Sequence, residues 1–490
     1  MARSIAQGVV SIAGSKVGAI LISITVTPLL VNLLGSANYG DYSVIISLLG
    51  LTFIVIDGGL FDGLRKFIAE NPDSEQWRSE VFTLYFQYSL GIAFFAFIII
   101  ALISLTDLPD QIFGAGFGTY FLLGGIILIG RQLFSLFRSL LHGLMEEHKA
   151  EPLRVVSQFT FGALAIGLVY QGLSVTGVLI ARITGLVLVI GIAIYFSHRY
   201  LKTTDLLSRD YDLITPSRMF SFNMGTVVLS LLMESMYQLD VLLLQPIHGS
   251  SISGYYKAAL VVCEFLWFVP TAIQTVFLHT SSQLWKEEQY EKITQLSSRS
   301  TRYSAVVLFL LVLGLAALAE PFMTTYYNPE FSRSVVPLLI LLPGTFGFAL
   351  VRPIFAIGQG KGSLKILIVA TGASALINLV MNLLLIPPFG MVGAATATSL
   401  GYGSMLVFHI VAARRIGFNP LADLRLARIL VTAAASAVPI FWLAANIRSD
   451  LLALAVVPPT GFVIYSVIAF TVGAVDTEDL NELLEEYRTD

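Results

Sequence analysis

The stretch Gly35-Ser36-Ala37-Asn38-Tyr39-Gly40-Asp41-Tyr42 recurs in a near copy, Gly249-Ser250-Ser251-Ile252-Ser253-Gly254-Tyr255-Tyr256. Four of the eight positions are identical, and the copies start at Gly35 and at Gly249. Each copy follows one long apolar segment and precedes another, which predicts a chain built from two parallel halves. Small residues also favour turns and tyrosines favour membrane interfaces, so the similarity needs support from other features.

The composition excludes a water-soluble globular protein. Of 490 residues, 56% are hydrophobic and only 12% are charged, with a mean hydropathy of +0.80. A helix that crosses a bilayer needs about 20 apolar residues. We therefore predict an all-α polytopic membrane protein with about 14 transmembrane helices, and no separate soluble catalytic domain. An enzyme is not expected.

Fourteen candidate spans follow from the apolar segments. They cover residues 8–34, 40–62, 80–106, 116–141, 153–171, 174–197, 219–246, 253–279, 303–325, 334–357, 366–386, 390–412, 429–447 and 451–474.

The distribution of Lys and Arg predicts the orientation of these spans. Alternate loops contain 21 of the 29 Lys and Arg, the other set of loops contains three, and the remaining five lie inside spans. Cytoplasmic loops carry the excess of positive charge, so both termini are expected in the cytoplasm. The chain is expected in the cytoplasmic membrane of a prokaryote.

Landmarks beyond the first copy support a repeat of six spans. Arg138 and Arg352 are separated by the same interval as the two copies of the turn, and the pair Gly177 and Gly185 recurs at a nearly equal interval as Gly393 and Gly401. We therefore expect two pseudo-symmetric six-helix lobes related by an axis along the membrane normal. They comprise residues 1–198 and 212–414, and residues 425–490 supply two additional helices and an acidic cytoplasmic tail.

Charged residues inside the spans are the candidate functional residues, because a charge in hydrocarbon costs several kcal/mol and usually faces protein or water. They are the cations Lys16, Arg131, Arg138, Arg182 and Arg352, and the carboxylates Asp57, Glu234, Asp240 and Glu264. When the second half is mapped onto the first, several of these charges fall on the same helical faces, which favours one shared cavity.

Two alternatives remain open for these charges. They can form buried ion pairs that lock helices together without touching a substrate. Arg138 and Arg352 also lie near the ends of their spans, where long side chains can extend to the membrane surface. Lys16, Arg131, Glu234 and Glu264 lie deeper and are the strongest candidates for a cavity lining.

Motifs for other kinds of chemistry are missing from the sequence. The segment Gly358-Gln359-Gly360-Lys361-Gly362 lacks the spacing of a phosphate-binding loop and the Ser or Thr after its lysine. The six histidines are scattered and there is one cysteine, so neither a metal site nor another cofactor is expected.

The segment PLLVNLLGSANYGDYSVIISLLGLTFIVIDGGLFDGLRKFIAE, Pro28 to Glu70, resembles the polysaccharide transporter family of lipid-linked oligosaccharide flippases. The similar pattern is an apolar helix that ends in a leucine-glycine turn, a Tyr-Gly-x-Tyr motif, a second helix, and then Gly-Leu with a basic loop. Arg352 to Gly358, followed by a basic loop, and Gly390 to Gly393 look like the same family.

The resemblance implies the two-lobed fold shared with multidrug and toxin extrusion exporters and lipid II flippases. It implies a substrate in which a polyprenyl phosphate or pyrophosphate carries sugar, moved to the outer leaflet by rocking of the lobes. Family flippases place basic residues in the cavity, and Lys16 fits that placement. The four arginines are assigned on charge and helical face alone, because a phosphate crossing hydrocarbon needs compensating cations.

Our first hypothesis is therefore a flippase for surface polysaccharide or glycoprotein assembly, whose partners are the lipid-linked glycan, membrane lipids and glycan-assembly enzymes. Nucleic acid is not an expected partner. The four carboxylates are expected to accept H⁺ or Na⁺ and reset the cavity. The alternative is a cation-coupled multidrug or metabolite exporter of the same fold, which would favour an acidic cavity. A membrane glycosyltransferase would need a nucleotide-sugar site that the sequence does not reveal.

Overall fold

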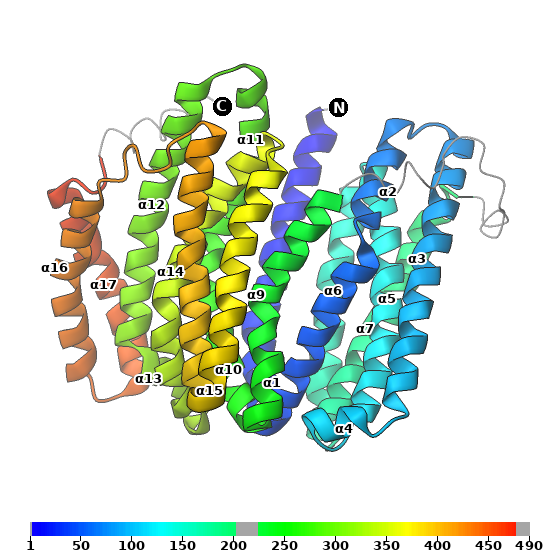
Figure 1. Cartoon of the computed structure of the whole chain (residues 1–490), viewed down its shortest axis with the longest axis horizontal. Helices are drawn as coiled ribbons and strands as arrows, with labels where there is room; N and C mark the ends of the chain where they lie inside the picture. Colours follow the sequence, from blue (N-terminus) through cyan, green and yellow to red (C-terminus); the bar gives the residue numbers. More distant parts are fainter. Residues whose placement is uncertain (1, 202–223, 477–490) are drawn as a thin grey trace. The chain divides into compact units, whose positions relative to one another are not determined.

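The computed structural model describes residues 2–201 and 224–476, with side chains from residue 14 onward except those of Lys16 and His279. The described residues form helices joined by short loops, with no β-strand among them (Figure 1). Most of the expected linker between the lobes and the tail beyond residue 476 lie outside the described residues. The prediction of an all-α chain is confirmed.

Twelve helices in the described ranges are long and apolar enough to cross a membrane. Two of them, α1 (Ala2–Asp57) and α15 (Leu364–Ile416), are far longer than the roughly 20 residues that a bilayer requires. Each contains a glycine with non-helical angles, Gly35 (φ 70°, ψ 174°) in α1 and Gly390 (φ 53°, ψ −130°) in α15. Each of these helices therefore consists of two helical arms (Figure 1), and counting both arms brings twelve spans to the expected fourteen or so.

The helices divide into two compact units, Met1–Gly254 and Tyr255–Asp490. The first unit contains α1, α2 (Leu60–Glu70), α3 (Glu75–Ser104), α4 (Leu108–Phe113), α5 (Phe117–Gly143), α6 (Glu147–Tyr170), α7 (Ser174–Ser197) and α9 (Met224–His248). The second contains most of α10 (Ser250–Glu264), then η2 (Phe265–Trp267), α11 (Phe268–Lys286), α12 (Tyr290–Ala317), α13 (Ala319–Tyr326), η3 (Pro329–Ser334), α14 (Val335–Gly360), α15, α16 (Leu426–Asn446) and α17 (Asp450–Val472).

The first unit extends beyond the expected lobe of residues 1–198 because α9 packs against α1. Ser47 of α1 donates a hydrogen bond to Gln238 Oε1 of α9 at 2.7 Å. Gln245 Nε2, two turns further along α9, donates to Asp41 Oδ1 at 2.7 Å. The boundaries of the two lobes stay a prediction, whereas these contacts are features of the first unit itself.

The backbone repeats at the turns where the sequence repeats. Gly249 has a φ of 83°, matching the φ of 70° at Gly35, its counterpart in the first copy. Ser174 has a φ of 45°, and Gly390, which follows it at the interval that relates Gly177 to Gly393, has a φ of 53°. A positive φ is uncommon for a residue with a side chain. Its occurrence at both pairs of positions is what a repeat of these hairpins predicts.

The two copies of the turn pack against each other within the first unit. A Cβ atom on Gly40 would lie 1.9 Å from the carbonyl oxygen of Ser250, and one on Gly254 would lie 2.0 Å from that of Ser36. These contacts are reciprocal, because Ser36 and Gly40 are the counterparts of Ser250 and Gly254. Glycine is required at both positions because two backbones meet there without space for a side chain.

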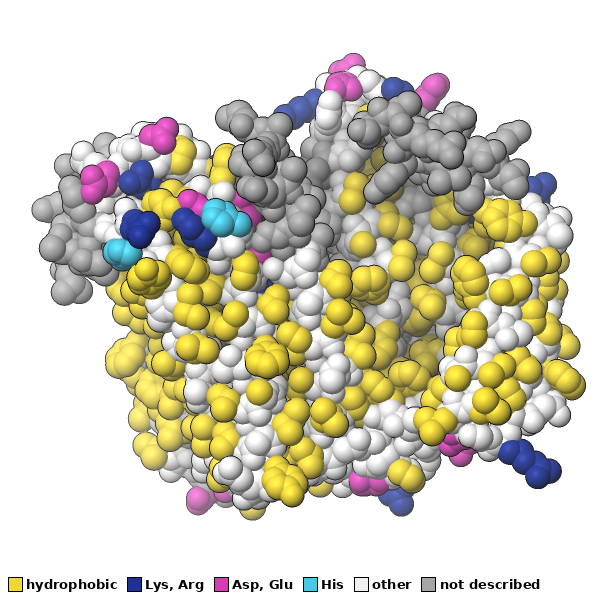
Figure 2. Space-filling view, turned by 180° about the vertical axis from the view of Figure 1, so that it is seen from behind, with side chains coloured by type: hydrophobic (Ala, Val, Ile, Leu, Met, Phe, Trp, Pro, Cys, Tyr) yellow, Lys and Arg dark blue, Asp and Glu magenta, His cyan; other side chains and the backbone are white. Residues whose placement is uncertain are grey.

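Apolar side chains fill the interior of each unit and also cover its outside. In the first unit Phe67, Phe82 and Leu140 belong to a buried cluster formed by α2, α3 and α5. In the second, Ile440 of α16 and Val457 of α17 pack on Leu318. Figure 2 shows hydrophobic side chains over the middle of the helices and most charged side chains near their two ends. This pattern is typical of helices that sit in a bilayer.

Candidate functional site

The first unit contains a cluster of charged side chains from four of its helices, which we call the central cluster: Asp57 of α1, Arg131 of α5, Arg182 of α7 and Glu234 of α9. Arg131 interacts electrostatically with the other three. The cluster contains two cations and two carboxylates, so its formal charges balance. Sequence reasoning selected all four residues and favoured one shared cavity, but it did not predict which of the charged residues lie together.

Arg131 lies in the middle of α5, about 18 Å along the helix from its end at Gly143 at a rise of 1.5 Å per residue. Its guanidinium stacks on the ring of Phe53 at 3.8 Å from the ring centre. Arg131 is exposed as a residue although its guanidinium is largely surrounded by protein, and the described part of the chain offers the guanidinium no hydrogen-bond acceptor. Arg131 therefore keeps its N–H donors for another partner while the carboxylates offset part of its charge.

Glu234 is held against α1 by a short chain of hydrogen bonds. Gln238, one turn further along α9, donates from Nε2 to Glu234 Oε1 at 2.9 Å, and Ser47 donates to Gln238. A Cβ atom on Gly50 would lie only 2.7 Å from Glu234 Oε1, so the missing side chain at Gly50 makes room for the carboxylate. This arrangement fixes the position of Glu234 relative to α1.

Arg182 and Asp57 lie at opposite ends of the central cluster. Arg182 donates a hydrogen bond to the Tyr42 hydroxyl at 3.1 Å, and its guanidinium lies 4.5 Å from the centre of the Phe161 ring. Asp57 is the last residue of α1, and its Oδ1 accepts from the backbone N–H of Phe61 in the first turn of α2 at 3.3 Å. A carboxylate is favourable there because the first turn of a helix has unpaired N–H groups.

Arg138 belongs to a second charged group, at the end of the unit where α5 stops and α6 begins. Glu151 Oε1 accepts from Arg138 at 2.5 Å and lies 3.2 Å from His142 Nε2. Arg154, three residues after Glu151, interacts electrostatically with both Arg138 and Glu151. We call Arg138, His142, Glu151 and Arg154 the α5–α6 cluster.

The remaining candidates lie apart from both clusters. Arg352, in the second unit, donates to Gln274 Oε1 at 3.3 Å, and its guanidinium lies 4.9 and 5.1 Å from the ring centres of Trp267 and Phe348. Glu264 ends α10, just before the 3₁₀ turn of η2. Asp240 is fully buried in the first unit and accepts from the N–H of Val241. The side chain of Lys16 lies outside the described part.

Several polar partners of these charges were missed by sequence reasoning. Ser47, Tyr42 and Gln238 are neutral, and neutral polar residues are common in membrane helices. The spacing of Glu234 and Gln238, four residues apart on one helical face, is a signal that was available. Glu151 and Arg154 were not selected because they lie at the start of the expected span 153–171, next to the preceding loop, and were not taken as charges inside the membrane. Within the described ranges, no group of three or more His, Cys, Asp or Glu is arranged to bind a metal.

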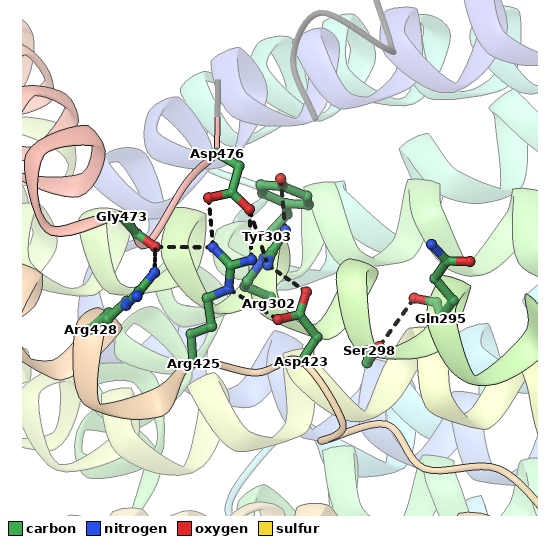
Figure 3. Close-up of polar contacts among 9 residues, drawn as sticks. All are labelled: Gln295, Ser298, Arg302, Tyr303, Asp423, Arg425, Arg428, Gly473 and Asp476. Atoms are coloured by element: carbon green, nitrogen blue, oxygen red, sulfur yellow. Dashed lines mark hydrogen bonds and ion pairs between the residues drawn. The ribbon is translucent and has the colours of Figure 1, made fainter. Parts of the chain in front are cut away.

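A third charged group joins α12, the loop before α16 and the end of α17 in the second unit (Figure 3). Arg302 is completely buried and pairs with Asp423 at 2.5 Å and Asp476 at 3.9 Å. Arg425 contacts both aspartates, at 3.0 and 2.6 Å. The hydrogen bond from Arg425 lowers the pKa of Asp476 below its ordinary value and raises the pKa of Arg425. The charges of Arg302 and Arg425 are offset by those of the two aspartates, so we assign this group a structural role.

A polytopic helical chain with an internal repeat and charged side chains in the middle of its spans defines the class of multi-pass membrane transporters. Residues 29–336 match the family described as polysaccharide biosynthesis protein. The chain belongs to this family. The prediction that it resembles polysaccharide transporters is confirmed.

Individual relatives are distant in sequence. The chain is 22% identical over 380 residues to the probable low-salt glycan biosynthesis flippase Agl15 of Haloferax volcanii. The aligned region covers 77% of this chain and 76% of that protein. The fold matches that of the lipid II flippase MurJ in an inward closed conformation, with a TM-score of 0.76 at 12% identity over 94% of this chain and 97% of MurJ. It also matches an inward-facing multidrug resistance MATE transporter, with a TM-score of 0.60 at 14% identity over 81% and 94%.

Proposed function

We propose that this chain is a flippase that moves a polyprenyl-phosphate- or pyrophosphate-linked sugar or oligosaccharide from the cytoplasmic to the outer leaflet by alternating access. The product would serve the assembly of surface polysaccharide or glycoprotein. Membership of a polysaccharide biosynthesis family and similarity to a protein named as a glycan biosynthesis flippase support this proposal. We place the chain in the cytoplasmic membrane of a prokaryote, with both termini in the cytoplasm.

The observation that carries the proposal is Arg131, whose guanidinium lies in the middle of a membrane-spanning helix and has no hydrogen-bond acceptor among the described residues. A phosphate group that enters hydrocarbon loses its hydration, and charge-assisted hydrogen bonds from arginine replace part of it. Arg182, in the same cluster, supplies a second cation. Lys16 is assigned the same role, and Arg352 and Arg138 would bind the substrate elsewhere on its path.

The carboxylates of the central cluster would control the charge of the empty site. Asp57 and Glu234 balance Arg131 and Arg182 when no substrate is present. A phosphate that binds the two arginines leaves the carboxylates without compensation, which favours uptake of H⁺ or Na⁺. We extend this coupling role to Asp240 and Glu264. The protein would act as a transporter and not as an enzyme, with glycan-assembly enzymes as its partners.

The proposal is tested by the appearance of a lipid-linked sugar in the outer leaflet of vesicles that contain the purified protein. We expect exposure of the sugar with the wild type and strongly reduced exposure with Arg131→Ala and with Lys16→Ala. Arg65→Gln, which removes an exposed cation of α2, is the matched control and should behave as the wild type. Unchanged exposure with Arg131→Ala and Lys16→Ala would contradict the assigned roles.

The similarity of the fold to a MATE transporter keeps a drug or metabolite exporter as the second candidate. An exporter of organic cations is expected to have a cavity with more carboxylates than cations, because negative charge attracts such substrates. In the central cluster the numbers of cations and carboxylates are equal. Drug resistance on expression, together with normal surface glycan after deletion of the gene, would support the exporter.

A further inference from the structure

The α5–α6 cluster has an excess of positive charge that the central cluster lacks. Its two guanidinium groups, on Arg138 and Arg154, share one carboxylate, Glu151. Protonation of His142, whose Nε2 lies 3.2 Å from Glu151, would add a further positive charge. Two like charges held close together are unfavourable unless an anion lies nearby.

The cations of the α5–α6 cluster are the accessible part of it. The side chain of Glu151 is only 4% exposed, whereas that of Arg138 is 30% exposed and Arg154 is an exposed residue. The carboxylate is therefore buried and accepts a hydrogen bond from Arg138, whose side chain stays partly exposed. Among the described residues, the Arg154 guanidinium has no hydrogen-bond acceptor, and neither does the buried Nε of Arg138.

The α5–α6 cluster lies on the same face of α5 as the arginine of the central cluster. Arg138 follows Arg131 by seven residues of α5, so the two arginines lie on the same helical face about 10 Å apart along the axis. Arg154 is one turn from Gln158, which donates to Ser23 of α1 at 3.1 Å, so α1 borders this side of α6. The distribution of Lys and Arg predicts that this end of the unit is cytoplasmic.

We propose that Arg138 and Arg154 form a separate docking site for the phosphate of the lipid-linked substrate, occupied before that phosphate reaches Arg131. This inference rests on the proposed function. Two guanidinium groups match the oxygens of a phosphate or diphosphate by paired hydrogen bonds, which lysine cannot reproduce. The α5–α6 cluster has an uncompensated cation and therefore binds the phosphate first. The charges of the central cluster are balanced, so it binds the phosphate less strongly and can release it.

The first experiment measures binding without transport, on the purified full-length protein in detergent. The probe is farnesyl phosphate, and farnesol is the neutral probe of the same chain length. Arg154→Gln is the test variant, because Arg138→Gln would leave Glu151 buried without its partner. We expect Arg154→Gln to weaken binding of farnesyl phosphate by about tenfold, as for the loss of one charge-assisted contact, and to leave farnesol binding unchanged.

Two further variants separate a specific site from general electrostatics. Arg154→Lys keeps the charge but not the paired donors and should recover only part of the affinity. Arg65→Gln is the matched control, because the backbone of Arg65 lies close to Gly143 at the same end of α5, and it should bind as the wild type. Equal affinity of the wild type and Arg154→Gln for farnesyl phosphate would overturn the proposal.

A competition experiment shows which lipid supplies the phosphate that binds, and a transport experiment tests the role of Arg154. Displacement of farnesyl phosphate by phosphatidylglycerol at equal concentration would overturn the assignment, because the site would then hold bulk anionic lipid. In vesicles, Arg154→Gln should raise the substrate concentration for half-maximal exposure while the maximal rate stays unchanged. If the wild type binds farnesyl phosphate but exposes no lipid-linked sugar, the proposed function is contradicted and the docking site is not. If Arg154→Gln lowers only the maximal rate of exposure, the docking role of Arg154 is contradicted.

Discussion

Arg131 illustrates how one residue acquires its properties from neighbours on other helices. Its position in mid-span makes the charge costly, and the Phe53 ring with two nearby carboxylates lowers that cost. None of these contacts uses the N–H donors of the guanidinium in a hydrogen bond within the described part of the chain. The result is a cation that is tolerated in the membrane and still able to bind an anion.

Gly50 tests whether the position of Glu234 matters for function. In Gly50→Ala the new Cβ would lie 2.7 Å from Glu234 Oε1, at the far end of a flexible side chain that can move. We expect the carboxylate to shift, stability to change by about 0.5 kcal/mol or less, and the rate of sugar exposure in vesicles to change at least severalfold. Gly18→Ala on the same helix, where the nearest atom would be 3.7 Å away, is the control. Identical rates of sugar exposure for Gly50→Ala and Gly18→Ala would show that the position of Glu234 does not affect transport.

Gly254 tests the contact between the two copies of the repeated turn. In Gly254→Ala the Cβ would lie 2.0 Å from the carbonyl oxygen of Ser36, so the backbones must separate. We expect a loss of about 1–3 kcal/mol or more, measured as a lower midpoint of thermal unfolding in detergent. Gly91→Ala, with no atom within 4 Å of the new Cβ, should be neutral or slightly stabilising. An unchanged midpoint for Gly254→Ala would show that the turns are not in contact.

Sequence reasoning could select the charged residues of the site but not their partners. A charge in an apolar segment is visible in the sequence because its cost does not depend on the neighbours, so Arg131, Arg182, Glu234 and Asp57 were all predicted. Which carboxylate balances which arginine depends on helix packing. Arg138 was predicted on the same grounds as Arg131, yet its contact with Glu151 places it in another cluster.

At the scale of the elements, hairpins explain why the number of helices differs from the number of spans. Gly35 and Gly390 turn the chain while the hydrogen-bonding pattern of a helix continues on both sides, so α1 and α15 each supply two crossings. Hydropathy places two apolar segments within each of these helices because it measures apolar length. It cannot show that a turn is built from one residue with a positive φ, although the repeated glycine at the first turn is the visible signal.

The charged group of Figure 3 connects the loop before α16 and the end of α17 to α12. In Asp423→Asn the buried Arg302 loses its nearer anionic partner, while Asp476 lies further away at 3.9 Å. We expect a loss of up to about 3 kcal/mol and a lower unfolding midpoint, because a buried charge that loses its partner is strongly destabilising. Asp73→Asn, which removes an exposed carboxylate, is the control. Equal midpoints for the two variants would contradict the structural role.

The same group predicts a dependence of stability on pH. Because the pKa of Asp476 is lower in the folded chain than its ordinary value of 3.8, its stabilising effect is present above that value and is lost as the pH falls through the folded pKa. The difference in unfolding midpoint between the wild type and Asp476→Asn should therefore be constant from about pH 5 to 8 and shrink below about pH 4. A difference that does not shrink at all as the pH falls below about 4 would contradict the ion pair.

At the scale of the whole molecule, two compact units each contain an arginine that lies on aromatic rings inside the membrane-spanning region: Arg131 in the first and Arg352 in the second. The balanced charges of the central cluster and the uncompensated cation of the α5–α6 cluster suit a substrate whose negative charge must enter, cross and leave. A sugar alone would need polar walls but no cations. The phosphate is therefore the part of the substrate on which the account depends.

The most direct test compares two lipid-linked sugars that differ only in the phosphate. Vesicles containing the wild-type protein are loaded with a polyprenyl-phosphate sugar or with the corresponding neutral polyprenyl glycoside, and the sugar in the outer leaflet is measured over time. We predict fast exposure of the phosphate-linked sugar and exposure of the neutral glycoside no faster than in protein-free vesicles. Equal exposure of both lipids by the protein, or of neither, would contradict the account.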